Sequence, residues 1–128
     1  MLRQDILAGI VAPSSADLAE AGPVLTFCLG RDFMAFQGHF PGNPVLPAFV
    51  QILIGQCALE TRSSRPWVLK RVDRAKFMKI IHPDQPLTLR WNQRPLGEGL
   101  RADFTLWVEG RKAASFTAEF LPREGPHA

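Results

Sequence analysis

The chain has 128 residues, of which 46% are hydrophobic and 21% are charged. This length and composition predict one globular domain with a hydrophobic core, and they exclude a disordered tail and a membrane-spanning protein, because no run of twenty apolar residues occurs. The net charge of +3 does not predict nucleic-acid binding, since the basic residues are not gathered into runs with interleaved aromatic residues.

The N-terminal part of the chain gives little structural signal, and residues 1–22 have no assigned element. Asp5 stands where a signal peptide carries positive charge, so we expect no cleaved leader. Cys28 and Cys57 lie in apolar sequence without the spacing of metal ligands. We therefore expect two buried, reduced thiols, no metal site and a cytoplasmic location.

The first clear element is a strand near residues 25–29, where apolar residues alternate with smaller or more polar ones. Pro and Gly then cluster at residues 38–47, which predicts a loop. From Ala48 to Arg62 there is no Pro, and apolar side chains cover nearly every side of a helical wheel. This segment is predicted to be a helix that is buried all round.

Four further strands are expected after the helix, at about residues 67–77, 86–93, 100–109 and 111–121. Between the last two strands, Glu109 and Gly110 predict a tight hairpin turn.

A fully apolar helix followed by long strands predicts an α+β fold, because neither element can bury its apolar surface alone. We expect a curved antiparallel sheet wrapped around one long central helix, the hot-dog architecture, in a single domain of residues 1–128 with a tail at 122–128. The open edges of such a sheet lead us to expect that two chains pair edge to edge as a homodimer or higher homo-oligomer.

Residues 36–51, FQGHFPGNPVLPAFVQ, resemble the motif of the 3-hydroxyacyl-acyl-carrier-protein dehydratases of the FabA/FabZ type. That motif reads approximately GHFPGxPVxPG and continues into the central helix. The stretches 72–87 and 109–120 are similar to the strands that follow in the family, so the resemblance covers about Val24 to Phe120. Gln51 resembles the ApeI-like, aryl-polyene dehydratase branch in particular.

The resemblance implies a dehydratase that acts on an acyl thioester held by the phosphopantetheine of acyl carrier protein or by coenzyme A, with no other cofactor. In the family a histidine removes the proton next to the thioester carbonyl, and a carboxylate on the partner's helix helps to expel the hydroxyl as water. His39 stands in the place of that histidine. The surrounding active-site loop includes Phe40, Pro41, Gly42 and Pro47. By the same resemblance, the backbone N–H of Ala48 receives the developing negative charge, although the family usually has glycine there.

Leu53 marks the main departure from the family, because it occupies the position of the catalytic Glu or Asp. Leucine cannot transfer a proton, and loss of such a group typically lowers a rate by about 10²- to 10⁴-fold. Gln56, one turn further along the helix, can hydrogen-bond a hydroxyl or a water but cannot act as an acid. The alternative is that Gln51 and Gln56 only satisfy backbone groups, and Glu60 is expected at a solvated helix end.

Three functions therefore stay open. The chain is a dehydratase in which His39 alone moves the proton, or a binding or structural subunit that pairs with an active homologue, or a thioesterase of the same fold. Leu53 also counts against the thioesterase, which generally requires a carboxylate on the helix.

A basic segment lies in the strand expected at residues 67–77 and just beyond it, and alternation places Arg74 and Lys76 on one face of that strand. Its candidate docking residues are Arg71, Arg74, Lys76 and Lys79. They either steer an acidic carrier protein or form an ordinary solvated strand face.

Overall fold

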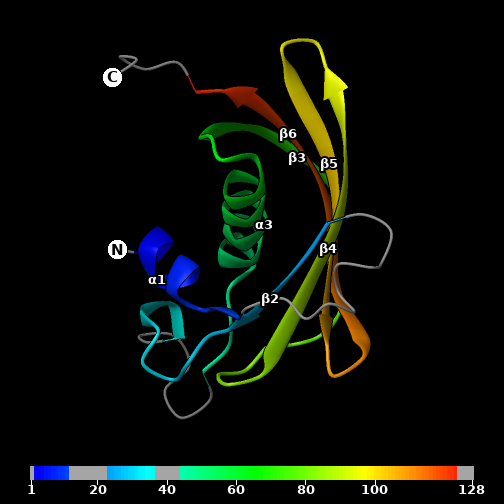
Figure 1. The fold of residues 1–128 in the computed structure, drawn as a ribbon. Coiled ribbons are helices and arrows are strands. Elements are labelled where there is room, and N and C mark those ends of the chain that lie inside the picture. The colour runs from blue at the N-terminus through cyan, green and yellow to red at the C-terminus, as the bar shows by residue number, and fades with distance from the viewer. Residues whose placement is uncertain (1, 12–22, 37–43, 124–128) are drawn as a thin grey trace.

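A computed structural model describes residues 2–11, 23–36 and 44–123. In it the long helix α3 (Ala48–Ser63) lies in the concave face of a curved, six-stranded antiparallel sheet (Figure 1). The spatial order of the strands is β1-β2-β4-β5-β6-β3. Their bounds are β1 (Ile10–Val11), β2 (Val24–Cys28), β3 (Trp67–Phe77), β4 (Pro86–Leu96), β5 (Gly99–Val108) and β6 (Arg111–Pro122). The predicted hot-dog fold is confirmed.

Two short elements, which the sequence did not predict, complete the described chain. The helix α1 (Leu2–Ala8) packs beside α3, on the side away from the sheet (Figure 1), and the 3₁₀-helix η1 (Met34–Phe36) follows β2. No helix within the described residues is long and apolar enough to cross a membrane.

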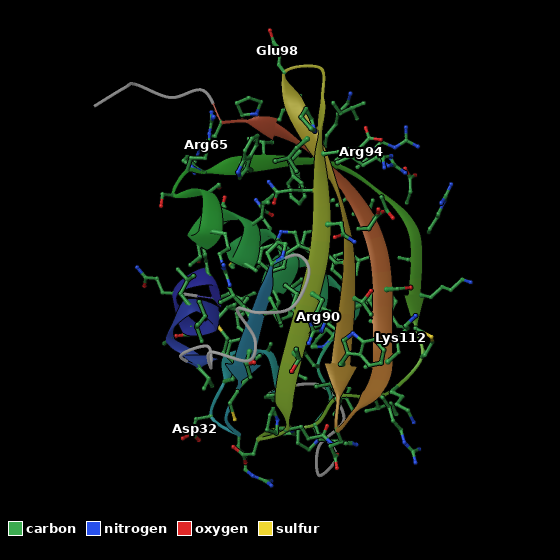
Figure 2. The ribbon with its side chains drawn as sticks, turned by 45° about the vertical axis from the view of Figure 1, so that its right-hand side comes forward. Asp32, Arg65, Arg90, Arg94, Glu98 and Lys112 are labelled. Atoms are coloured by element: carbon green, nitrogen blue, oxygen red, sulfur yellow. The ribbon has the colours of Figure 1, made fainter. Side chains whose placement is uncertain are left out.

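The strands form where apolar and polar residues alternate. In β5 the buried residues Phe104 and Leu106 face the helix, whereas Trp107, which lies between Leu106 and Val108, points to the convex face. There the ammonium group of Lys112 lies 5.7 Å from the Trp107 ring, and Figure 2 labels Lys112 on β6. Glu109 and Gly110 both have positive φ, 50° and 75°, so the predicted tight hairpin between β5 and β6 is confirmed.

The middle of α3 packs unusually closely on the sheet because it carries Gly55. A Cβ atom at this position would lie 3.1 Å from the rings of both Phe104 and Phe116. These two rings are stacked, with centroids 5.0 Å apart. A residue without a side chain therefore lets the helix backbone approach an aromatic layer of the core.

The expectation that α3 is buried all round is wrong for the single chain. Val50, Ile54 and Leu59 are fully buried, but Phe49 is 61% exposed and Leu53 is only half-buried. The reason is geometric: the sheet covers one side of the helix and α1 covers part of another, which leaves a strip near the start of the helix uncovered.

The prediction of two buried thiols holds for Cys57 and is wrong for Cys28, which is exposed. Phe27 points into the core, and successive residues of a strand point to opposite faces. The last residue of β2 is therefore directed away from the core.

The C-terminal end of α3 is fastened to the start of β3. Gln56 Nε2 donates a hydrogen bond to the carbonyl of Trp67 at 2.9 Å, and the Trp67 N–H donates to the Glu60 carboxylate, also at 2.9 Å. Glu60 also forms an ion pair with Arg3 of α1, and its side chain is only 16% exposed. The expectation that Glu60 is solvated is therefore wrong, since two partners hold its carboxylate. Arg65, labelled in Figure 2, lies over the Trp67 ring at 4.7 Å.

Candidate active site

The N-terminal end of α3 is open at the level of the backbone. Pro47 occupies the N-cap position and makes no side-chain cap, and its carbonyl accepts the N–H groups of Val50 and Gln51, both at 3.2 Å. Within the described residues, the N–H groups of Ala48 and Phe49 have no acceptor. The N-terminal end of this 16-residue helix attracts negative charge, through these N–H donors and through the helix dipole.

The segment before the helix is held by the connection between β3 and β4. The Leu46 N–H donates to the carbonyl of Ile81 at 2.9 Å, and the Nδ1 atom of His82 lies 3.2 Å from the carbonyl oxygen of Pro44. These two contacts fix the position of the first turn of α3 relative to residues 77–80.

A cavity of about 240 Å³ lies between these two segments. Its described lining consists of Val45, Leu46, Ala48, Gln51, Phe77, Met78, Lys79 and Ile80. The lining is apolar except for Gln51 and Lys79. Since ligand cavities usually measure about 300 to 1,000 Å³, this one suits the reacting end of a ligand and not a whole cofactor-sized molecule.

Gln51 is a buried polar residue in this lining, with 3% exposure. Its Nε2 atom donates to the carbonyl of Leu46 at 3.2 Å, and its Oε1 atom has no hydrogen-bond partner within the described part of the chain. The orientation of the amide follows from this contact, because only the nitrogen can donate to a carbonyl. One acceptor of a residue that lines the cavity therefore remains unsatisfied.

The structure separates the other helix residues that the sequence singled out. Ala48 is the first residue of α3 and lines the cavity, whereas neither Leu53 nor Gln56 is among the described residues of the lining. Leu53 packs half-buried against the core. The amide of Gln56, in the middle of the helix, donates to the carbonyl of Trp67 at the start of β3.

The proposed base and most of its loop, His39, Phe40, Pro41 and Gly42, lie outside the described residues. Pro47 is described, as the N-cap of α3. The roles of all five residues stay predictions.

The basic residues of β3 lie on the outer strand of the sheet. Arg71 donates a hydrogen bond to Asp73 at 3.0 Å, and this guanidinium lowers the pKa of the Asp73 carboxyl. Arg74 has a positive φ of 52° and lies at an irregularity of the β3–β6 pairing between Asp73 and Lys76, which interrupts the alternation that the sequence predicts. Arg74, Lys76 and Lys79 are exposed.

Two parts of the site were not recognised from the sequence. Of residues 77–80, only Lys79 was a candidate site residue from the sequence, for its charge, yet Phe77, Met78 and Ile80 also line the cavity. The unsatisfied oxygen of Gln51 was also missed, although a glutamine in the first turns of an apolar helix was the signal that could have indicated it.

Comparison with known sequences gives a clear match. Residues 16–117 match the family model described as ApeI-like, ApeI dehydratase. The 3-hydroxyacyl-[acyl-carrier-protein] dehydratase FabZ of Oenococcus oeni is 31% identical over 94 residues, which cover 67% of this chain and 68% of the relative. The FabZ of Alkaliphilus metalliredigens is also 31% identical, over 93 residues that cover 66% of this chain and 63% of the relative.

Comparison with solved structures supports the fold. The dehydratase heterocomplex ApeI:P of Xenorhabdus doucetiae matches with a TM-score of 0.67 at 22% identity, covering 77% of this chain and 85% of that one. A thioesterase of Thermus thermophilus, complexed with coenzyme A and Zn, matches with a TM-score of 0.63 at 16% identity, covering 82% and 87%. At these identities the likeness concerns the arrangement of helix and sheet.

Proposed function

The chain belongs to the ApeI-like dehydratase family, and we propose that it is a lyase that eliminates water from a 3-hydroxyacyl thioester. The match of residues 16–117 to that family is the observation that carries this proposal. Curated relatives named as 3-hydroxyacyl-[acyl-carrier-protein] dehydratases support acyl carrier protein as the natural carrier, with coenzyme A as an alternative carrier of the same phosphopantetheine arm.

In the proposed reaction, neutral His39 removes a proton from carbon 2 of the acyl chain, and the electron pair moves onto the thioester oxygen as an enolate. The imidazolium then gives its proton to the hydroxyl on carbon 3. The bond from carbon 3 to oxygen breaks, water leaves, and the electron pair of the enolate forms the double bond between carbons 2 and 3. One histidine thus acts first as base and then as acid.

The proposed site for the enolate oxygen is the N–H of Ala48. This N–H has no acceptor among the described residues and belongs to a residue that lines the cavity, which supports the assignment. A preorganised backbone donor of this kind stabilises negative charge without reorganisation during the reaction. The extra methyl group of Ala48, where the family usually has glycine, narrows the space for the substrate.

The chain is proposed to work at least as a dimer. The outer strand β3 pairs with β6 within the described chain and carries the exposed apolar residues Val68, Leu69 and Phe77. A second strand that pairs with this edge would cover them. Arg74, Lys76 and Lys79 are exposed and available to attract an acidic carrier protein, whereas Arg71 already contacts Asp73.

A second candidate function is a subunit that binds the thioester but depends on a homologue for the carboxylate. Leu53 at the position of the family's Glu or Asp favours this, and the solved dehydratase heterocomplex of Xenorhabdus doucetiae has a fold similar to that of this chain. In such a pair, the homologue would supply its carboxylate to the site that contains His39.

The test is the hydration of crotonyl-coenzyme A, the reverse of the proposed reaction. We expect the wild type to hydrate it and His39→Ala to be slower by about 10²- to 10⁴-fold. His127→Ala, which changes another of the three histidines, serves as the matched control and should retain the wild-type rate. Equal rates for the wild type and His39→Ala would contradict the proposal.

The same assay distinguishes the alternatives. Release of free coenzyme A from the thioester would identify a thioesterase. An inactive wild type that becomes active only after mixing with a carboxylate-bearing homologue would establish the second candidate function.

A further inference from the structure

The unsatisfied oxygen of Gln51 requires an explanation, because a buried acceptor without a partner destabilises a folded protein. The side chain is held in place: Gln51 is 3% exposed, and its Nε2 atom is bound to the Leu46 carbonyl at 3.2 Å. Leu46 is held in turn by its own N–H, which donates to the Ile81 carbonyl at 2.9 Å. The Oε1 atom is thus a fixed acceptor that makes no bond within the described structure.

Its position relates it to the proposed chemistry. Gln51 and Ala48 are three residues apart on one helix, so they share a face, and both line the 240 Å³ cavity. A ligand whose carbonyl oxygen reaches the Ala48 N–H therefore brings its neighbouring atoms near Gln51. The rest of the lining is apolar apart from Lys79.

We infer that Gln51 is a substrate-positioning residue whose Oε1 atom accepts a hydrogen bond from the 3-hydroxyl group of the bound acyl thioester. The inference rests on the proposed function and specifies how the site recognises its substrate. Near the reacting carbons, such a thioester carries two hydrogen-bond donors, the 3-hydroxyl and the first amide N–H of the phosphopantetheine arm. Because Oε1 is buried, it suits a small hydroxyl better than an amide flanked by chain on both sides.

This contact has a chemical consequence in a chain that lacks the family's helix carboxylate. The hydroxyl leaves as water only after its oxygen accepts a proton. When the glutamine oxygen accepts the hydrogen of the 3-hydroxyl group, the lone pairs of the hydroxyl oxygen stay free to take the proton from His39. Gln51 thereby orients the leaving group, although an amide cannot itself supply the proton.

The test compares two ligands that differ in this hydroxyl alone, 3-hydroxybutyryl-coenzyme A and butyryl-coenzyme A. Dissociation constants are measured by calorimetry in the His39→Ala background, so that turnover during the measurement is strongly reduced. We expect this background to bind the hydroxyl ligand about five- to tenfold more tightly, as one hydrogen bond provides. Gln51→Met should bring the ratio close to one while its affinity for butyryl-coenzyme A changes little.

Gln56→Met is the matched control, because it also removes a buried glutamine of α3 whose amide binds a backbone carbonyl. It should keep the preference for the hydroxyl ligand. If Gln51 is only structural, its replacement weakens the binding of both ligands equally. The ratio of their dissociation constants then persists, which overturns the inference.

A ratio of one in the background itself also overturns the inference and leaves the proposed function intact, since both thioesters bind. Failure of both ligands to bind would overturn the proposed function, and the inference with it.

Discussion

Gly55 and Phe104 are in direct contact across the interface between helix and sheet: a Cβ atom at position 55 would lie 3.1 Å from two carbons of the Phe104 ring. The ring has little freedom to move, because it is stacked on Phe116 and also contacts the rings of Trp91 and Phe120. The absence of a side chain at this position therefore sets the distance between α3 and the sheet.

Replacement of Gly55 by Ala is expected to destabilise the protein by about 1 kcal/mol. Alanine gains about 1 kcal/mol in helix propensity, but an added methyl group in a tightly packed core typically costs about 1–3 kcal/mol. Urea denaturation measures the difference as a lower midpoint with an unchanged slope. Glu98→Ala at the exposed tip of the β4–β5 hairpin (Figure 2) is the control and should leave the midpoint unchanged. A raised midpoint in Gly55→Ala would mean that the rings can move aside.

Leu53→Glu should restore the carboxylate of the family. We expect it to raise the rate of crotonyl-coenzyme A hydration at least about tenfold, because a positioned acid or base typically contributes about 10²- to 10⁴-fold. A loss of stability should accompany the gain, since Leu53 is half-buried against the core and a carboxyl group is costly there. Leu53→Gln introduces a side chain of nearly the same size as Glu that cannot transfer a proton, so it should not raise the rate. If Leu53→Glu and Leu53→Gln have equal rates, another part of the catalytic machinery is also missing.

The Glu60 carboxylate is expected to stabilise the fold more by its hydrogen bond with Trp67 than by its ion pair with Arg3. Glu60→Ala leaves the part-buried N–H of Trp67 without its acceptor, so we expect a loss of about 1–2 kcal/mol in the free energy of unfolding. Arg3→Ala removes the ion pair, and Arg3 is 44% exposed, so the loss in the free energy of unfolding should stay below about 1 kcal/mol. Thermal or urea unfolding of the two variants checks the order. Since Glu60→Ala removes the ion pair as well, equal losses in the two variants would show that the link between α1 and α3 dominates.

The two cysteines should differ sharply in reactivity. Burial raises the pKa of the Cys57 thiol, whereas Cys28 is exposed. A thiol reagent at pH 8 should therefore modify one thiol of the native protein rapidly and the second only after unfolding, because the thiolate is the reactive form. Cys28→Ser should abolish the rapid phase. A rapid phase that persists in Cys28→Ser would show that the core around Cys57 opens readily.

The same shift has a consequence for stability at alkaline pH. The Cys57 thiol ionises at a higher pH in the folded state than in the unfolded state. In an unfolded chain the pKa of a cysteine thiol is about 8.5. Its contribution to stability is therefore complete below that value and is lost as the pH rises through the pKa of the folded state. Cys57→Ala should remove this part of the alkaline destabilisation.

Local sequence patterns were sufficient to predict the main elements. The predicted helix at residues 48–62 and the observed helix Ala48–Ser63 differ by one residue, and the hairpin turn at Glu109 and Gly110 forms as expected. Both follow from short-range physics, namely the absence of proline in an apolar stretch and the need for positive φ in a two-residue turn. The motif of residues 36–51 likewise identified the family to which the chain belongs.

Burial and pairing were decided only by the tertiary structure, because they depend on segments that are far apart in the chain. The exposure of Phe49 and Cys28 and the anchoring of Glu60 by Arg3 and Trp67 depend on which surfaces the sheet and α1 cover. The cavity likewise exists because residues 77–80 lie beside the first turn of α3. A sequence states which groups are polar, but only the packed chain determines which of them, like the oxygen of Gln51, are left without a partner.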